Sequence, residues 1–108
     1  MSVVLRAVPR FEKYPNEVIN QAVDFTEILD TGETIITATV TAKRYDTGAD
    51  ATSDVINGSP TVLTGTSVSY QLTGGTASLT YILNVSATLD SAEIYSQRIR
   101  MDVVDIPE

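Results

Sequence analysis

Residues 78–89 of this chain read SLTYILNVSATL, and their alternation decides the fold. Every second residue from Leu79 to Leu89 is apolar or aromatic, whereas the residues between them are polar except for Ile82. A period of two residues is typical of a β-strand with one buried face. The stretch therefore predicts a long, half-buried strand in an all-β domain.

The sequence on either side adds more strands to this one. Residues 34–43, TIITATVTAK, alternate over a β-branched run, which places Ile36 and the other even positions through Ala42 on one buried face. The glycines at 74–75 predict a tight turn before residues 78–89. Further strands are expected at residues 53–57, 61–64, 67–73 and 93–104. About seven short strands with turns every 8–12 residues indicate a two-sheet β-sandwich, built from antiparallel hairpins.

Residues 18–29, VINQAVDFTEIL, fit two patterns. Apolar residues at odd positions between Ile19 and Phe25 suit one face of a strand, while Val18 begins a set at helical spacing. We favour a strand around residues 21–26 followed by a short turn, and the helix stays open as the alternative.

Residues 1–17 are predicted to be an extended N-terminal arm, and residues 18–108 the sandwich domain. Pro9 and Pro15 restrict the arm to extended conformations. The first thirteen residues carry Arg6, Arg10 and Lys13 against Glu12, a net +2, whereas the whole chain has a formal charge of -7. The apolar residues of the arm pack either on their own domain or on a neighbouring subunit.

Composition excludes several classes of function. The chain has no His, Cys or Trp, so the Ser-His-Asp and Cys-His nucleophile systems, disulfides and the usual zinc sites are absent. Fourteen acidic residues against seven basic ones argue against nucleic acid and anionic membranes as partners. No apolar run reaches the ~20 residues of a membrane span. We expect a protein made in the cytoplasm without catalytic residues, cofactor or metal.

Two groups of polar residues are candidate sites. Asp46, Asp50 and Asp54 could supply oxygens to Ca²⁺, but we favour a solvated acidic loop because such sites need about six converging oxygens. Arg98 and Arg100 lie on the outward face of the last strand, where they balance nearby acids or contact an acidic neighbour. Tyr14 and Tyr45 lie outside the strongly alternating strands and are interface candidates, unlike Tyr70 and Tyr81, which are expected in the core.

The order of the motifs resembles a family of small tailed-bacteriophage virion proteins, the fibre-tail adaptor or head-associated proteins. An FEKYPNEV arm leads into AVDFTEIL and DTGETIITATV, and the double-glycine hairpin and a final strand RIRMDVVD follow. The matching positions are Lys13, Pro15, Glu17, Val18, Asp24, Phe25, Leu29, Gly32, Glu33, Thr34, Ile35, Gly74, Gly75, Thr76 and Val103. The resemblance implies an immunoglobulin-like sandwich without a substrate.

By this resemblance the chain is expected to be a structural part of the virion, an adaptor, cement or decoration protein present in multiple copies. Its partners would be capsid, neck or tail subunits, and residues 1–17 would reach onto a neighbour. The expected partner-binding residues are Val4, Arg6, Arg10, Phe11, Lys13, Tyr14, Tyr45, Arg98 and Arg100. The alternatives are a carbohydrate-binding module with exposed aromatics and, less favoured, a hydrolase with a facing acid pair.

Overall fold

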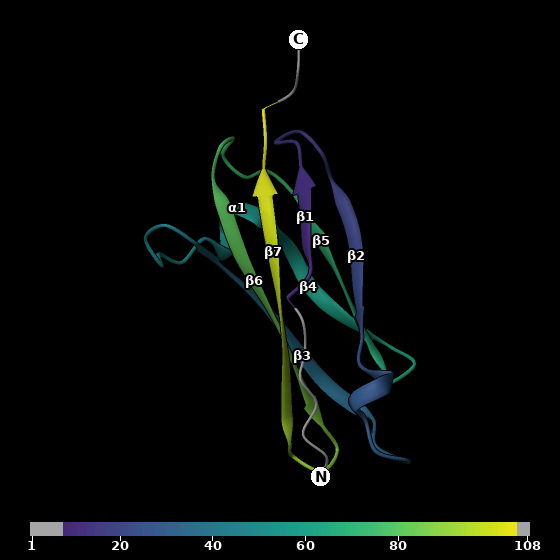
Figure 1. Ribbon diagram of the computed structural model, residues 1–108. Helices are drawn as coiled ribbons and strands as arrows, with labels where there is room; N and C mark the ends of the chain where they lie inside the picture. Colours follow the sequence, from purple (N-terminus) through teal and green to yellow (C-terminus); the bar gives the residue numbers. More distant parts are fainter. Residues whose placement is uncertain (1–7, 106–108) are drawn as a thin grey trace.

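The computed structural model describes residues 8–105, which form a β-sandwich of two sheets (Figure 1). The strands are β1 (Arg10–Lys13), β2 (Ile19–Asp24), β3 (Ile35–Arg44), β4 (Ile56–Leu63), β5 (Ser67–Leu72), β6 (Thr80–Leu89) and β7 (Ile94–Val103). One sheet has the order β1-β7-β6-β3, and the other has the order β2-β5-β4. The expected all-β sandwich of about seven strands is confirmed.

Strand β6 lies inside the larger sheet and carries the alternation that the sequence shows. Its inward side chains, from Tyr81 to Leu89, are at most 1% exposed. Strand β7 pairs with it antiparallel from Thr80 opposite Asp102 to Thr88 opposite Ile94. Burying each large aliphatic side chain stabilises the fold by roughly 1.5–3 kcal/mol, so this hairpin supplies much of the core.

Strand β3 begins with an irregularity in its pairing, and the first side chains of the strand point to the opposite faces from those expected. The register with β6 shifts between Ile35 and Thr37, so one extra residue is inserted there. The insertion puts Ile35 in the core at 5% exposure and turns Ile36 outward at 59% exposure. The prediction that Ile36 is buried was therefore wrong, because a β-bulge exchanges the two faces on one side of it.

The segment before β4 differs from the expected pair of short strands. Residues 53–57 are not a separate strand, since Thr52–Val55 form one helical turn, α1, and a single strand β4 follows it. Asp50 Oδ1 accepts hydrogen bonds from the backbone N and Oγ1 of Thr52, which favours a turn over an extended start. Val55 of this turn is fully buried, so the turn covers part of the core.

The ambiguous residues 18–29 form a strand, as favoured. Strand β2 ends at Asp24, and a 3-10 turn, Thr26–Ile28, follows it. The Asp24 carboxylate accepts hydrogen bonds from the backbone N and Oγ1 of Thr26 and so starts that turn. Phe25, between strand and turn, is 2% exposed and anchors the segment in the core.

Part of the expected arm belongs to the larger sheet. Strand β1 pairs with β7 in parallel, with Arg10 opposite Arg100 and Lys13 opposite Val103, so the sandwich is not wholly antiparallel. Residues 1–7 lie outside the described part of the chain. The proposal that an arm reaches a neighbour therefore concerns the residues before β1. Within residues 8–105 no helix has the length and apolar character needed to cross a membrane.

The buried tyrosine of β5 predicts a loss of stability at alkaline pH. Tyr70 is 5% exposed, and burial raises its pKa to about 12. An unfolded chain releases this proton near pH 10, so the folded state binds more protons between about pH 10 and 12 and stability falls as pH rises there. We expect urea midpoints to fall less steeply over this range in Tyr70→Phe than in the unchanged protein. The exposed Tyr45→Phe serves as control, and equal slopes for all three proteins would contradict the assignment.

Candidate functional site

The outer face of the larger sheet gathers basic side chains from three strands. The strand register places Arg10 of β1 beside Arg100 of β7, and Ile82 of β6 lies between Arg100 and Lys43 of β3. Arg98 projects from the same face of β7 in the neighbouring row. We call these four cations, together with Tyr45 just after β3, the basic face.

Asp102 holds two arginines of this face in place. Its carboxylate accepts a hydrogen bond from Thr80 Oγ1 at 2.7 Å and forms ion pairs with Arg10 Nε at 2.6 Å and Arg100 Nε at 3.3 Å. The Thr80 hydrogen bond and then the two arginines hold the pKa of Asp102 below its usual range. Because both arginines meet Asp102 through Nε, their terminal nitrogens remain as donors for an incoming carboxylate.

An aromatic ring completes the basic face. The Arg100 guanidinium carbon lies 5.2 Å from the centre of the Tyr45 ring, which is a cation–π distance. Tyr45 is 62% exposed, so its ring is accessible to a partner. A groove of about 370 Å³ runs past this ring and is lined by Thr41, Lys43, Arg44, Tyr45, Gly48, Ile82, Asn84 and Arg98.

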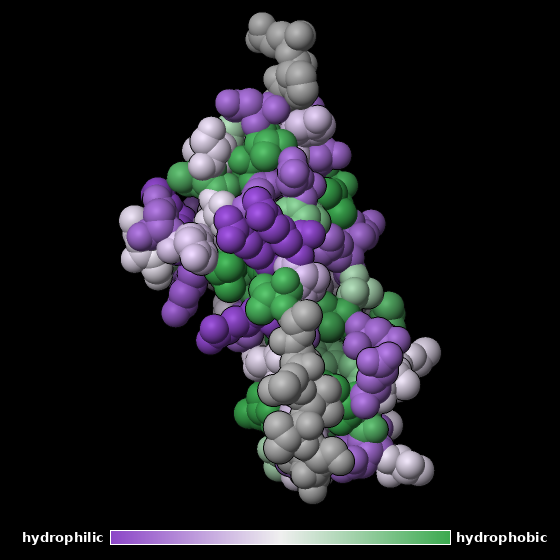
Figure 2. Space-filling view, viewed as in Figure 1, coloured by the Kyte–Doolittle hydropathy of each residue, from purple (hydrophilic) through white to green (hydrophobic). Residues whose placement is uncertain are grey.

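Six acidic residues lie together at one end of the molecule. They surround the 3-10 turn, the β2–β3 loop and the β6–β7 turn, at the lower end of the sandwich in Figure 1. They are Asp24, Glu27, Asp30, Glu33, Asp90 and Glu93. Figure 2 shows strongly hydrophilic side chains over the middle of β1 and β7, where the basic face lies. Arg10, Lys43, Arg98 and Arg100 thus share one sheet face with only Glu12 and Asp102, away from these six acids.

Lys13 was expected to contact a partner, but the structure places it in the interior. It is 1% exposed, and its Nζ donates hydrogen bonds to the carbonyl oxygens of Gly74 at 2.7 Å and Tyr14 at 2.9 Å. Burial lowers the pKa of this lysine, and nearby Glu17 partly opposes the shift. Lys13 thus joins the end of β1 to the β5–β6 loop at Gly74, so we correct its assignment from interface to structural residue.

The residues after Lys13 form a turn that explains the KYPNE motif. Glu17 N donates to Tyr14 O at 3.1 Å, while the Glu17 side chain accepts from Tyr14 N at 2.7 Å. Asp30 and Glu33 of the DTGE motif make the same reciprocal pair, at 3.0 and 2.7 Å. In each turn, the glutamate at the fourth position accepts a hydrogen bond from the backbone N–H of the first residue, which the turn itself leaves unpaired. Both motifs are therefore structural.

The loop that joins β5 to β6, residues 73–79, contains two glycines whose backbone requires glycine. Gly74 and Gly75 have φ angles of +55° and +91°. A Cβ on Gly75 would lie 2.9 Å from the Val103 side chain. The predicted tight turn was wrong, because β5 and β6 lie in different sheets and residues 73–79 join them as a loop, in which the turn falls at Ala77–Ser78. The loop brings the Gly74 carbonyl to Lys13.

The other expected partner-binding residues are dispersed. Phe11 is half-buried and lines a second groove, between β1 and β2. Tyr14 is half-buried in its turn, and Val4 and Arg6 lie outside the described residues. Four expected residues, Arg10, Tyr45, Arg98 and Arg100, therefore meet on the basic face.

Two alternative sites find little support in the geometry. Asp46 pairs with Arg44 at 2.8 Å and Asp50 bonds Thr52, so these carboxylates serve their own loop. No group of three or more potential metal-ligating acids occurs within residues 8–105. The aromatic rings of Phe25, Tyr70, Tyr81 and Tyr95 are buried, which leaves Tyr45 as the one exposed aromatic residue in the described chain. One ring does not make the planar platform expected of a carbohydrate-binding module.

Sequence reasoning missed Asp102, Lys43 and Ile82 as parts of this face. The alternation of residues 34–43 does place Lys43 with the outward threonines, which was an available signal. The position of Asp102 between two arginines depends on strand register, which has no local signature in the sequence.

The chain also matches the model of a known protein family. The model of a family described as podophage GP4 fiber-tail adaptor protein gp77 matches residues 13–102. The match thus begins at the buried lysine, ends at the aspartate that anchors the basic face, and covers strands β2 to β6 and most of β7. No curated protein matches the chain.

Proposed function

The chain belongs to the podophage GP4 fiber-tail adaptor protein gp77 family, and from this premise we propose that it is a non-enzymatic virion adaptor that binds an acidic surface of another virion protein through its basic face. The observation that carries the proposal is the convergence of Arg10, Arg98 and Arg100 with the exposed Tyr45 on one sheet face. Arginine and tyrosine are the residue types enriched at the energetic centres of interfaces.

The arrangement of these side chains supports binding rather than chance exposure. Asp102 and Thr80 hold Arg100 so that its guanidinium keeps a defined position beside Tyr45. A held side chain loses less conformational entropy when a partner binds, which favours affinity. Six acidic residues lie at the far end of the sandwich, and the basic face carries four cations against Glu12 and Asp102, so the local field there attracts an anionic partner despite the net charge of the chain.

The proposal includes the location and copy number of the protein. An adaptor of this family would join tail subunits and fibre components within the virion, in several copies around a symmetric axis. It would neither bind nucleic acid nor insert into a membrane. No step in this role requires a substrate or a cofactor.

Neutralising two cations of the basic face is expected to reduce incorporation into particles. Lys43 and Arg98 are both exposed and take no part in the core, so Lys43→Gln/Arg98→Gln should fold as the unchanged protein does. Losing two charged contacts should weaken partner binding by about tenfold or more. The measurement is the number of copies per purified particle, by quantitative mass spectrometry, when the variant replaces the unchanged protein during assembly.

The control carries the same change in net charge on the other sheet. Ser59→Glu/Thr61→Glu alters two exposed positions of β4 and also makes the chain more negative by two charges. It should join particles normally, because the effect depends on the face and not on net charge. Normal incorporation of Lys43→Gln/Arg98→Gln would contradict the proposal that this face binds a partner.

A further inference from the structure

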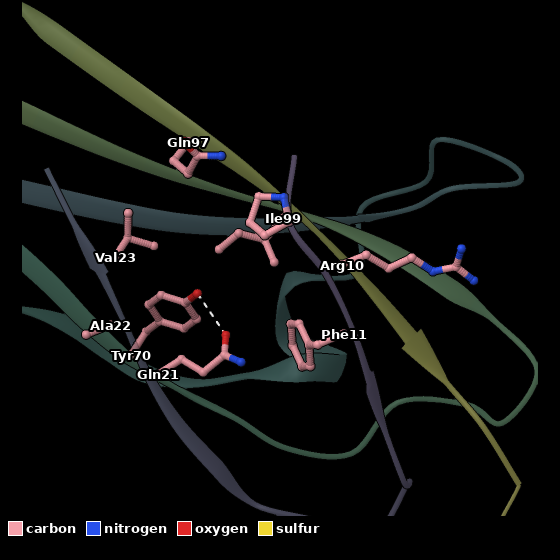
Figure 3. Close-up of a pocket in the computed structure, with 9 residues that line it drawn as sticks. Arg10, Phe11, Gln21, Ala22, Val23, Tyr70, Gln97 and Ile99 are labelled. Atoms are coloured by element: carbon pink, nitrogen blue, oxygen red, sulfur yellow. Dashed lines mark hydrogen bonds between the residues drawn. The ribbon is translucent and has the colours of Figure 1, made fainter. Parts of the chain in front are cut away.

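The second groove lies at the side of the sandwich where β1 and β2 form the two sheet edges. Its volume is about 610 Å³, within the usual range of binding pockets (roughly 300–1,000 Å³). Figure 3 shows Phe11, Val23, Tyr70 and Ile99 around it, drawn from both sheets. The guanidinium of Arg10 extends away from the groove in this view, and Tyr70 bonds Gln21. The lining is therefore mostly apolar, with Gln21, Gln97 and the Tyr70 hydroxyl as its polar groups, and the charged end of Arg10 lies outside it.

The edge strand beside this groove lacks the features that block strand addition. Strand β2, INQAVD, keeps a regular register with β5 over all six residues and has no Pro, Gly, Lys or Arg. Its single charge, Asp24, is at its end and is engaged by Thr26. No strand within residues 8–105 pairs with its other side. Edge strands of this kind accept an extended segment of another chain.

The other two long edges are protected. Strand β4 contains Pro60, and its register with β5 shifts between Asn57 and Thr61. Strand β3 has the bulge at Ile36, and near its end Ala42 O accepts a hydrogen bond from Ala51 N at 2.8 Å. Pro, bulges and covering loops are the common means of blocking edge-to-edge association. The contrast singles out β2 as the accessible edge.

The residues that precede Val8 match this edge in chemistry and in length. They read MSVVLRA, and as a strand they would place Val3, Leu5 and Ala7 on one face and Val4 and Arg6 on the other. Seven extended residues span about 23 Å, close to the ~20 Å of β2. The apolar face suits the uncharged groove, while Arg6 would remain in solvent.

Local chain geometry disfavours insertion of this segment into its own groove. Pro9 O accepts a hydrogen bond from Arg100 N at 2.9 Å, so the chain is still tied to β7 at that point. Val8 precedes a proline, which biases it to an extended conformation. Residues 3–8, VVLRAV, contain no Gly, Asn, Asp, Ser or Pro, the residues that dominate tight reversals. A segment from a neighbouring copy needs no such reversal.

We propose that residues 2–7 of one copy add as a strand to the β2 edge of the next copy, with Val3 and Leu5 in the groove. This inference rests on the proposed function only in that it requires several copies side by side. It gives the adaptor a second contact, between its own copies, distinct from the basic face that meets another protein. Such head-to-tail exchange closes a ring when the rotation between copies permits it.

Disulfide cross-linking tests the contact directly, because the chain has no cysteine of its own. Two full-length variants, Val4→Cys and Ala22→Cys, are mixed at a concentration on the order of 1 mM and oxidised. Arg6→Cys replaces Val4→Cys in a second mixture to sample a register shifted by one residue pair. Facing residues of adjacent strands lie close enough for a disulfide, so a mixed dimer should form.

The control replaces Ala22→Cys by Thr39→Cys, an exposed position on β3. Mixed dimers with Ala22→Cys well above this control support the proposal, and equal yields overturn it. In the double variant Val4→Cys/Ala22→Cys, a disulfide within one chain would also overturn it, since the segment would then occupy its own groove. If cross-linking fails while incorporation still depends on Lys43 and Arg98, the strand exchange is ruled out and the proposed function stands. If cross-linking succeeds while Lys43→Gln/Arg98→Gln is incorporated normally, the partner-binding role of the basic face is ruled out and the strand exchange stands.

Discussion

Replacing Lys13 by alanine is expected to lower the free energy of unfolding by about 3 kcal/mol, a large part of the stability of a domain this size. The side chain is 1% exposed, so its removal leaves a cavity at the end of β1. The Gly74 carbonyl also loses the ammonium donor at 2.7 Å, and a buried unpaired carbonyl costs about 1–3 kcal/mol. The measurement is the urea midpoint by circular dichroism, at constant m-value.

Two further variants separate the causes. Lys13→Met keeps most of the side-chain volume and removes the ammonium, so it should lose only about half as much stability. Lys43→Ala removes an exposed lysine and should stay within about 0.5 kcal/mol of the unchanged protein. If Lys13→Ala were as stable as Lys43→Ala, the idea that Lys13 holds β1 to the β5–β6 loop would be wrong.

The second large effect is expected for Asp102→Ala, which should cost about 2 kcal/mol and also weaken partner binding. Asp102 is 8% exposed, and its loss leaves Thr80, Arg10 and Arg100 without their shared acceptor. Arg10 is then no longer tied to β7 by its side chain, and Arg100 loses the contact that holds it beside Tyr45. The free energy of unfolding and the copies per particle should therefore fall together.

The pH dependence of this variant gives an independent check. The folded state lowers the pKa of Asp102, so its contribution to stability is present above the ordinary aspartate pKa and is lost as pH falls through the lower, folded value. Asp102→Ala should therefore show a flatter decline in stability below about pH 4 than the unchanged protein. The exposed Asp105→Ala is the matched control. An unchanged acid decline in Asp102→Ala would contradict the role of the carboxylate.

Much of the fold could be predicted because alternation is a local property of the chain. Strands β6 and β7 and their inward residues follow from the period of two, since a half-buried strand must place apolar side chains on one face. The same reasoning found β2 in a stretch that also fitted a helix. It failed at Ile36, where a bulge inserts one residue and exchanges the faces, because nothing in TIITATV marks which residue is extra.

The candidate site, like the fold, could be predicted from the sequence only in part. The sequence determined by itself that this chain is an all-β sandwich without His or Cys chemistry, and its motif order pointed to the phage adaptor family that the comparison confirmed. It also identified Arg10, Arg98, Arg100 and Tyr45 as exposed candidates.

Only the tertiary structure decided that these four residues lie on one face, and that Lys13 does not share it. Residues 10 and 100 are brought together by the parallel pairing of β1 with β7, a contact between distant segments that depends on register. Lysine side chains are usually solvated, and only the approach of the Gly74 carbonyl to the end of β1 explains a buried one. Local pattern specifies which face a side chain occupies, whereas long-range pairing specifies its neighbours.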